Sequence, residues 1–268
     1  MIAIDITAGN ARRFPPVGRC IYCGGNGGGI LTTEHVFPKG IGGGLVLPRA
    51  SCTPCQREIN TFETICMRKT LLPYRKAKGL IRHPNDLPAT VPLVFDLEFR
   101  GPRQVSLDVC PNVVVLPGLR ELPGILKGRS PEPLVQFDYK IFAGLDILEE
   151  TKRRMEEEQH VGIFLDGYAW LRMLAKIAHG YAIAELGFDR FSPALPDLIL
   201  GRNPLLASYF VGKCPVPPPI PDSPPLLMIE MRCAGVGKRR FVAVNIRLFA
   251  DLGHEAPVYT VVAGSFAE

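Results

Sequence analysis

CIYC at residues 20–23 and CTPC at residues 52–55 are two C-x2-C pairs, and 28 residues separate them. Each pair can present two thiolates from one tight turn to a tetrahedral zinc ion. A single pair could serve as a redox motif, but a second pair at this distance, in a segment with little core of its own, favours structural zinc. The bound ion would then contribute directly to folding, because small zinc modules depend on ligation. The predicted zinc ligands are Cys20, Cys23, Cys52 and Cys55.

The N-terminus and the remaining cysteines bear on the compartment of the protein. The opening MIAIDITAGNARR has no basic segment followed by an apolar one, so it does not resemble a secretory signal, and a cytoplasmic location is the default expectation. In that setting, eight cysteines favour metal binding or buried thiols over a disulfide framework. Residues 161–188 are apolar but interrupted by charged side chains, so no membrane-spanning helix is expected. The isolated cysteines, which are expected to be buried, are Cys66, Cys110, Cys214 and Cys233.

The stretch between the two cysteine pairs contains LTTEHVFPKGIGG, residues 31–43. The sequence resembles the HNH endonucleases in the order of three motifs. These are CIYCG, then this stretch with its Glu-His pair, proline and double glycine, and then ASCTPC. The similarity is to the subgroup in which two cysteine pairs brace a metal-binding ββα hairpin, and it covers about residues 20–65. The resemblance implies an N-terminal ββα-metal, treble-clef-like zinc module, for which we expect the bounds 1–85.

The resemblance also implies a role for each of three residues. His35 would be the general base that activates water, and Glu34 would be a ligand of a catalytic Mg²⁺ or Mn²⁺ ion. Gln56 stands where the family usually has asparagine or histidine, and its amide oxygen could be the other ligand of that ion. Neighbours in a strand point to opposite faces, so the backbone must bend for Glu34 and His35 to face one phosphate. The middle asparagine of the family pattern is not evident in residues 43–51, so a backbone carbonyl or another side chain would have to orient the histidine.

The segment after the second cysteine pair is predicted to be helical and is strongly basic. Residues 54–69 lack glycine and have no proline after the first position, and their apolar residues fall at helical spacing. Residues 57–82 contain seven Lys or Arg against two Glu. A solvated helix face would explain this charge, but its position beside the acidic-histidine motif favours contact with a polyanion. The candidate nucleic-acid contacts are Lys39, Arg57, Arg68, Lys69, Arg75, Lys76 and Lys78.

Residues 86–268 are expected to form a second, mixed α+β domain with antiparallel strands. Alternating apolar and β-branched residues predict a hairpin-like pair of strands within residues 90–116. The proline-rich residues 214–225 predict an extended connection, because proline cannot donate the hydrogen bonds of a helix or central strand. Two or three further strands after this connection are expected to form an antiparallel meander.

Two helices are predicted in the same region. Residues 145–159 have the charge pattern of a surface helix. Residues 164–186 are apolar on most faces, so this segment should form a helix that packs against the sheet and stops at Gly187. Lys176 and His179 on this helix are expected at the edge of the core, with the lysine reaching solvent.

The sequence thus predicts a metal-dependent HNH endonuclease that hydrolyses phosphodiester bonds, in DNA more than in RNA, with zinc as the structural ion. One alternative is a zinc module that binds nucleic acid without cleaving it, which Gln56 and the missing asparagine favour. Another is a subunit of a larger nucleic-acid-processing or defence complex. The expected partner is nucleic acid, with a protein partner or a second copy of the chain as a further option for residues 86–268. No membrane association is expected.

Overall fold

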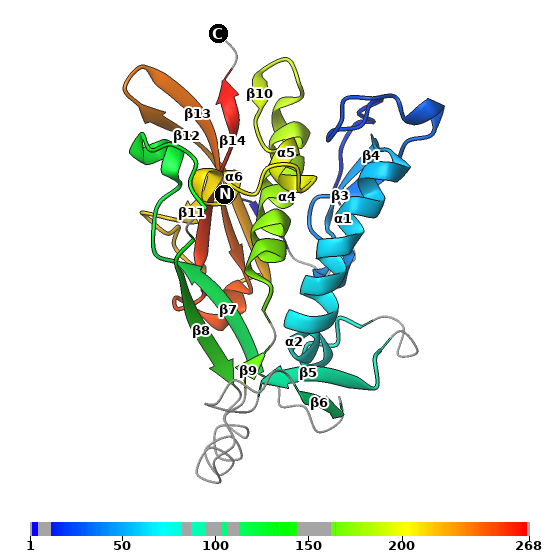
Figure 1. The fold of residues 1–268 in the computed structure, drawn as a ribbon, viewed down its shortest axis with the longest axis vertical. Helices are drawn as coiled ribbons and strands as arrows, with labels where there is room; N and C mark the ends of the chain where they lie inside the picture. Colours follow the sequence, from blue (N-terminus) through cyan, green and yellow to red (C-terminus); the bar gives the residue numbers. More distant parts are fainter. Residues whose placement is uncertain are drawn as a thin grey trace.

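The computed structural model shows a mixed α and β fold in which antiparallel strands dominate the sheets (Figure 1). The predicted α+β class is confirmed at this level. The residues that the structure describes are 2–4, 12–81, 87–94, 103–106, 113–133, 135–143, 162–163 and 165–266.

The largest sheet is built mainly from the C-terminal part of the chain. Its strand order among the described residues is β1-β12-β13-β14-β10, with β11 also paired to β14, and all of these pairs are antiparallel. The last three strands form the predicted meander, and the two-residue turn between β12 and β13 has Gly237 at φ +58°, a conformation that favours glycine. The strands are β1 (Ile2–Ile4), β10 (Phe191–Pro193), β11 (Val211–Lys213), β12 (Leu227–Val236), β13 (Arg239–Leu248) and β14 (Val258–Phe266).

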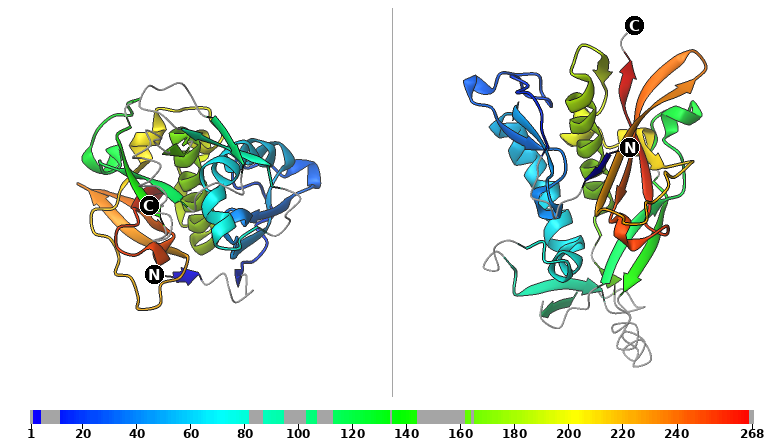
Figure 2. Two further views of the ribbon diagram at one scale, coloured as in Figure 1. Left: turned by 90° about the horizontal axis from the view of Figure 1, so that it is seen from below. Right: turned by 180° about the vertical axis from the view of Figure 1, so that it is seen from behind.

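Helix α4, Gly167–Leu186, lies at the centre of the fold. It packs against β13 and β14 on one side and against α1 (Thr53–Ile65) on another, as Figure 1 and Figure 2 show, and this explains its apolar surface. Asp166 caps its N-terminus by accepting a hydrogen bond from the N–H of Ala169 at 2.9 Å. Gly187, at φ +68°, ends the helix as predicted. Among the described helices, none is both long and apolar enough to span a membrane.

The N-terminal part of the chain forms two antiparallel strands followed by a helix. Strand β3 (Thr32–His35) pairs with β4 (Leu45–Ser51), and β2 (Arg12–Arg13) joins β4 in parallel. Helix α1 begins two residues after β4, within the second cysteine pair. The predicted helix is confirmed as α1 and a single π turn, Cys66–Thr70, after which a shorter helix, α2 (Leu72–Ala77), begins.

The middle of the chain contributes two small sheets. Strand β5 (Thr90–Val94) pairs antiparallel with β6 (Arg103–Ser106), which confirms the predicted hairpin-like pair in part, because residues 113–116 belong to another sheet. Strand β9 (Gly162–Ile163) pairs with the other edge of β5. Strand β7 (Val113–Leu119) pairs with β8 (Phe137–Ala143) in a sheet of its own. Helix α2 packs against β7, so this sheet lies beside the N-terminal part of the chain.

Two further predictions concern the segments around these sheets. The charged helix predicted over 145–159 lies outside the described residues. Residues 214–225 contain neither helix nor strand, as predicted, and the carbonyl oxygen of Pro218 accepts a hydrogen bond from Arg247 of β13 at 3.0 Å. The short helices are η1 (Gly27–Gly29), η2 (Lys39–Ile41), η5 (Gly124–Lys127), α5 (Pro196–Ile199), α6 (Leu206–Phe210) and η6 (Ala250–Leu252).

The isolated cysteines are only partly as predicted. Cys66 and Cys214 are buried, which confirms the prediction for these two. Cys233 is exposed, so its predicted burial was wrong. The reason is its position in the half of β12 that extends beyond the core, where most side chains are exposed or partly exposed. Cys110 lies outside the described residues.

Removal of the α4 cap should destabilise the protein. Asp166→Ala deletes the acceptor for the N–H of Ala169, and loss of such a cap costs about 1 kcal/mol. The midpoint of urea unfolding, followed by far-UV circular dichroism, should therefore fall. Asp166→Asn keeps an acceptor oxygen and should remain close to the parent protein. Equal losses in both variants would show that the stabilisation does not come from this hydrogen bond.

Candidate functional site

The four cysteines of the two C-x2-C pairs converge at the start of α1. Their Sγ atoms all lie within 4.8 Å of one another, and those of Cys23 and Cys52 are 3.7 Å apart. Four thiolates bound to zinc at the usual distance of ~2.3 Å form a tetrahedron with edges of about 3.8 Å. The cluster therefore has the dimensions of a zinc site, and no other group of three or more His, Cys, Asp or Glu side chains placed to hold a metal is found among the described residues.

Backbone hydrogen bonds bring the two cysteine pairs together. The N–H of Cys20 donates to the carbonyl oxygen of Gly25 at 2.8 Å, which closes the turn that contains the first pair. The N–H of Ile21 donates to the carbonyl oxygen of Ala50 in β4, also at 2.8 Å, and this bond places the first pair beside the second. Cys52 is the N-terminal flanking residue of α1, so a metal ion held by the cluster would fix the start of that helix.

The chemistry of the four side chains fits zinc. Cys20, Cys52 and Cys55 are buried, and burial raises the pKa of the Cys20 and Cys55 thiols. Four thiolates at this separation repel one another, so they ionise together only around a cation. Zn²⁺ binds all-sulfur tetrahedral sets of this kind in structural sites.

Loss of one thiolate should release the metal and unfold the N-terminal part of the chain. Cys52→Ser opens a closed tetrahedral site, and ligation contributes directly to the folding of such segments. Zinc content and far-UV circular dichroism should both decrease. Cys233→Ser, at an exposed cysteine outside the cluster, is the matched control and should retain both signals. Full zinc content in Cys52→Ser would contradict the assignment.

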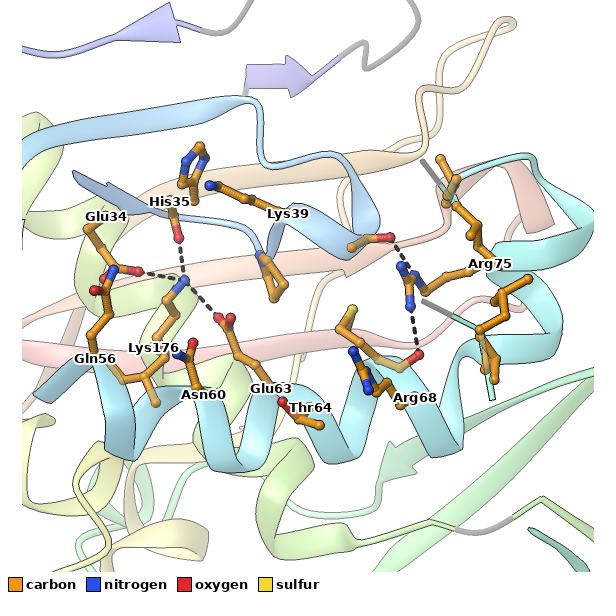
Figure 3. Close-up of a pocket in the computed structure, with 18 of the residues that line it drawn as sticks. Glu34, His35, Lys39, Gln56, Asn60, Glu63, Thr64, Arg68, Arg75 and Lys176 are labelled. Atoms are coloured by element: carbon orange, nitrogen blue, oxygen red, sulfur yellow. Dashed lines mark hydrogen bonds and ion pairs between the residues drawn. The ribbon is translucent and has the colours of Figure 1, made fainter. Parts of the chain in front are cut away.

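A cavity of about 680 Å³ lies between β3 and α1 (Figure 3), and we name it the His35 cavity. This volume is within the range of about 300–1,000 Å³ that is usual for ligand sites. The lining side chains from α1 and the π turn after it are Gln56, Ile59, Asn60, Glu63, Thr64, Met67 and Arg68. On the side of β3 and η2, the cavity is lined by Thr33, Glu34, His35, Pro38, Lys39 and Gly40.

His35 is half-buried on the wall of this cavity. Its Nδ1 lies 3.1 Å from the carbonyl oxygen of Gly43, and because a carbonyl can only accept, Nδ1 donates and Nε2 is the unprotonated nitrogen of the neutral ring. Gly43 has φ +56°, and a Cβ there would lie 3.1 Å from Nδ1, so glycine permits this contact. The carbonyl of Gly43 thus orients the ring of His35, a task that the resemblance to HNH endonucleases would assign to an asparagine.

The electrostatics of the site favour the neutral form of His35. Burial lowers the pKa of its imidazole, and the nearby charges of Lys39 and Lys176 lower it further, against the opposing effect of the Gly43 hydrogen bond. A neutral imidazole is the form that can accept a proton. His35 is therefore suited to act as a base near neutral pH.

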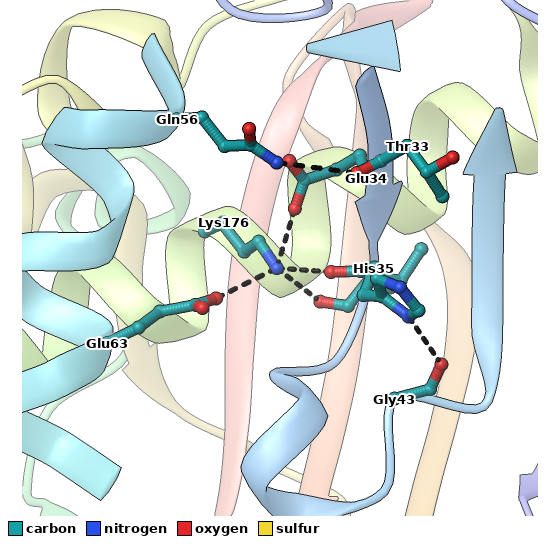
Figure 4. A network of polar contacts seen from close by, with 8 residues as sticks. Thr33, Glu34, His35, Gly43, Gln56, Glu63 and Lys176 are labelled. Atoms are coloured by element: carbon teal, nitrogen blue, oxygen red, sulfur yellow. Dashed lines mark hydrogen bonds and ion pairs between the residues drawn. The ribbon is translucent and has the colours of Figure 1, made fainter. Parts of the chain in front are cut away.

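Glu34 is directed toward a buried lysine rather than toward the ring of His35 (Figure 4). Nζ of Lys176, from α4, lies 2.8 Å from Oε1 of Glu34 and 2.9 Å from Oε1 of Glu63 on α1. The same ammonium donates hydrogen bonds to the carbonyl oxygens of His35 and Val36. Lys176 is 1% exposed, so the prediction that it reaches solvent was wrong. Burial by itself lowers the pKa of Lys176, but Glu34 and Glu63 outweigh it and the pKa is raised.

As arranged, the residues expected to hold a catalytic Mg²⁺ or Mn²⁺ ion do not fit it. Lys176 already engages the carboxylate of Glu34. The side chains of Glu34 and His35 leave β3 in different directions in Figure 4, so they do not face one phosphate together. Gln56 donates through Nε2 to the carbonyl oxygen of Thr33 at 3.5 Å, a long contact. Mg²⁺ requires near-octahedral oxygen ligands at about 2.1 Å, and this arrangement does not supply them.

The basic residues predicted to contact nucleic acid fall into two groups. Lys39, Arg68 and Arg75 line the His35 cavity. Arg75 is fixed there, since it donates to the carbonyl oxygens of Gly40 and Met67 at 2.7 and 2.9 Å. The residues that do not line the cavity are Arg57, Lys69, Lys76 and Lys78.

One face of α4 carries three basic side chains that contact the N-terminal part of the chain. Arg172 forms an ion pair with Glu58 of α1 at 2.7 Å, and Lys176 follows one turn later. His179 donates through Nε2 to the carbonyl oxygen of Ile21, inside the first cysteine pair, at 2.7 Å. It is fully buried rather than at the core edge, and burial lowers its pKa to about 4. These contacts join residues on the two sides of residue 85, after which a domain boundary was expected.

Lys176, Glu63 and Gly43 were not predicted from the sequence as parts of this site. Lys176 lies 141 residues after His35, and no local spacing relates the two. One signal was present, however, because Arg172, Lys176 and His179 stand on one face of an otherwise apolar helix. Charged groups on a buried helix require partners, so this face indicated a polar contact with another element.

Comparisons of the chain with protein-family models, with curated proteins and with solved structures find no match. The function is therefore inferred from the residues and contacts of the site itself.

Proposed function

We propose that this chain is a zinc-braced HNH-type nuclease that hydrolyses phosphodiester bonds in nucleic acid, in DNA more than in RNA, with His35 as the general base. The observation that carries the proposal is the His35 ring, which a backbone carbonyl orients on the wall of a cavity that also presents Lys39 and Arg68. The chain order of cysteine pair, β3, β4, cysteine pair and α1 supports the proposal, because the resemblance expects a braced hairpin and helix in this order.

Hydrolysis of a phosphodiester needs a base within reach of the attacking water. With Nδ1 bound to the carbonyl of Gly43, the neutral ring of His35 accepts the proton of that water at Nε2. The water oxygen forms a bond to phosphorus as the bond from phosphorus to the leaving oxygen breaks. The leaving oxygen is protonated from solvent, and the imidazolium then returns its proton to solvent, which restores the base.

Side-chain cations supply the positive charge in this proposal. Lys39 is exposed and lies beside His35 in Figure 3, and Arg68 lies along the opposite wall. Such groups bind phosphate oxygens and offset the charge that develops during the reaction. No step is assigned to a divalent cation, since Glu34 and Gln56 do not fit one as arranged.

A second candidate function is nucleic-acid binding without cleavage. The observation that favours it is the ion pair of Lys176 with Glu34, because it engages the carboxylate that would hold the catalytic ion. The cavity would then bind a phosphate while His35 transfers no proton. A cleavage assay separates the two functions.

Replacement of His35 tests the proposed base. Plasmid and single-stranded DNA are incubated with purified protein in the presence and absence of Mg²⁺ or Mn²⁺. His35→Ala should reduce the cleavage rate by about 100-fold or more, the usual contribution of a general base. His254→Ala, at an exposed histidine outside the cavity, should retain the parent rate. Equal behaviour of the parent and His35→Ala would favour the binding module instead.

Neutralising the cavity cations should weaken nucleic-acid binding at every salt concentration. The double variant Lys39→Ala with Arg68→Ala should lower the slope of log affinity against log salt by about 0.9 for each phosphate that the protein no longer neutralises. Arg202→Ala is the matched control, because Arg202 is not among the candidate contacts, lies outside the cavity and pairs with Asp197 at 3.3 Å. Fluorescence anisotropy with labelled duplex DNA measures both slopes, and an unchanged slope in the double variant would remove this surface from the interface.

A further inference from the structure

We propose that the ammonium of Lys176 is a built-in replacement for a divalent cation: it pairs with both Glu34 and Glu63 from inside the protein, and the chain takes no Mg²⁺ or Mn²⁺ at these carboxylates. Lys176 acts as a positioning residue, since it contacts the backbone carbonyl of His35 and not its ring. The proposal goes beyond the nuclease proposal and stands whether the His35 cavity cleaves nucleic acid or only binds it.

Four oxygen atoms of the protein surround the ammonium (Figure 4). Oε1 of Glu34 and Oε1 of Glu63 lie 2.8 and 2.9 Å from Nζ of Lys176. The carbonyl oxygens of His35 and Val36 accept its hydrogen bonds, the latter at 3.3 Å. Carboxylate and carbonyl oxygens are the ligands that Mg²⁺ and Mn²⁺ prefer. The ammonium therefore occupies an oxygen-rich position that would otherwise suit a divalent ion.

Burial makes a cation necessary at this position. The side chains of Lys176 and Glu34 are only 1% and 5% exposed, and that of Glu63 is 18% exposed. Two carboxylates this close to one ammonium also lie close to each other, and without a cation they would repel in a poorly solvated site. Burial raises the pKa of Glu63 against the lowering effect of the Lys176 ammonium, and the charge of Glu34 adds to the increase.

The covalent attachment of Lys176 to α4 favours the ammonium over a free ion. On the same helix face, Arg172 pairs with Glu58 at 2.7 Å and His179 donates to the carbonyl of Ile21 at 2.7 Å, so α4 is fixed on both sides of Lys176. A divalent ion would have to displace the ammonium and leave it buried without a partner, which is strongly unfavourable. The structure therefore disfavours exchange.

The test removes the ammonium and leaves room for an ion in its place. In zinc-loaded Lys176→Ala the four oxygens remain, and a divalent ion has room to bind among them. Titration with Mn²⁺, followed by electron paramagnetic resonance, should show a bound ion in this variant that the parent protein lacks. The thermal unfolding midpoint of the variant should rise by about 5–10 °C when Mn²⁺ reaches roughly 100 times its Kd. The midpoint of the parent protein should not respond to Mn²⁺.

Two matched variants identify the ligands. Lys176→Met removes the charge but fills the space, so it should not bind Mn²⁺. Adding Glu34→Gln to Lys176→Ala removes a charged ligand and should weaken Mn²⁺ binding by at least about tenfold.

Two results would overturn the proposal. One is a Mn²⁺ site in the parent protein that Glu34→Gln abolishes, and the other is a folded Lys176→Ala protein that shows no response to Mn²⁺. If Lys176→Ala folds only in the presence of Mn²⁺, the proposal is supported, and if it stays unfolded with Mn²⁺, the proposal fails. Since the readout is ion binding, a negative cleavage assay for the nuclease proposal leaves this conclusion unaffected.

Discussion

A buried ammonium group connects three elements of this chain that are distant in sequence. Lys176 of α4 meets Glu34 of β3 and Glu63 of α1, and it also holds the backbone at His35. Loss of one partner from such a buried pair costs about 3–5 kcal/mol, whereas replacement of the whole pair by apolar groups can be neutral. The interaction therefore matters less for net stability than for where it places β3 relative to the two helices.

Two different bonding systems brace the N-terminal part of the chain. The cysteine cluster has the dimensions of a zinc site and brings the turn of the first cysteine pair to the start of α1. The side chains of Arg172, Lys176 and His179 on one face of α4 contact α1, β3 and the turn of the first cysteine pair from the other side. Because both systems act on the same strand and helix, the space between them is held open as the His35 cavity.

The charge distribution around this cavity is the basis of the proposed phosphate contact at His35. Burial and the cations Lys39 and Lys176 lower the pKa of the imidazole, against the opposing charge of Glu63, and this favours the neutral ring. The carbonyl of Gly43 fixes the ring without adding a negative charge that would repel a polyanion. Arg68 and Arg75 extend the positive surface along the helical wall. In the proposed reaction, a neutral base among cations would combine proton transfer with phosphate binding at one place.

Local patterns in the sequence were sufficient to predict the parts of the structure that depend on residues close together in the chain. The cysteine spacing predicted the metal cluster, helical periodicity predicted α1 and α4, Gly187 predicted where α4 ends, and alternation predicted the terminal meander. The tertiary structure alone decided that Lys176 is buried against Glu34 and that the carbonyl of Gly43 orients His35. Periodicity reports which face of an element is apolar, but it does not report which charge from a segment 141 residues away will meet that face. Only the packing of α4 against α1 and β3 brings those groups within bonding distance.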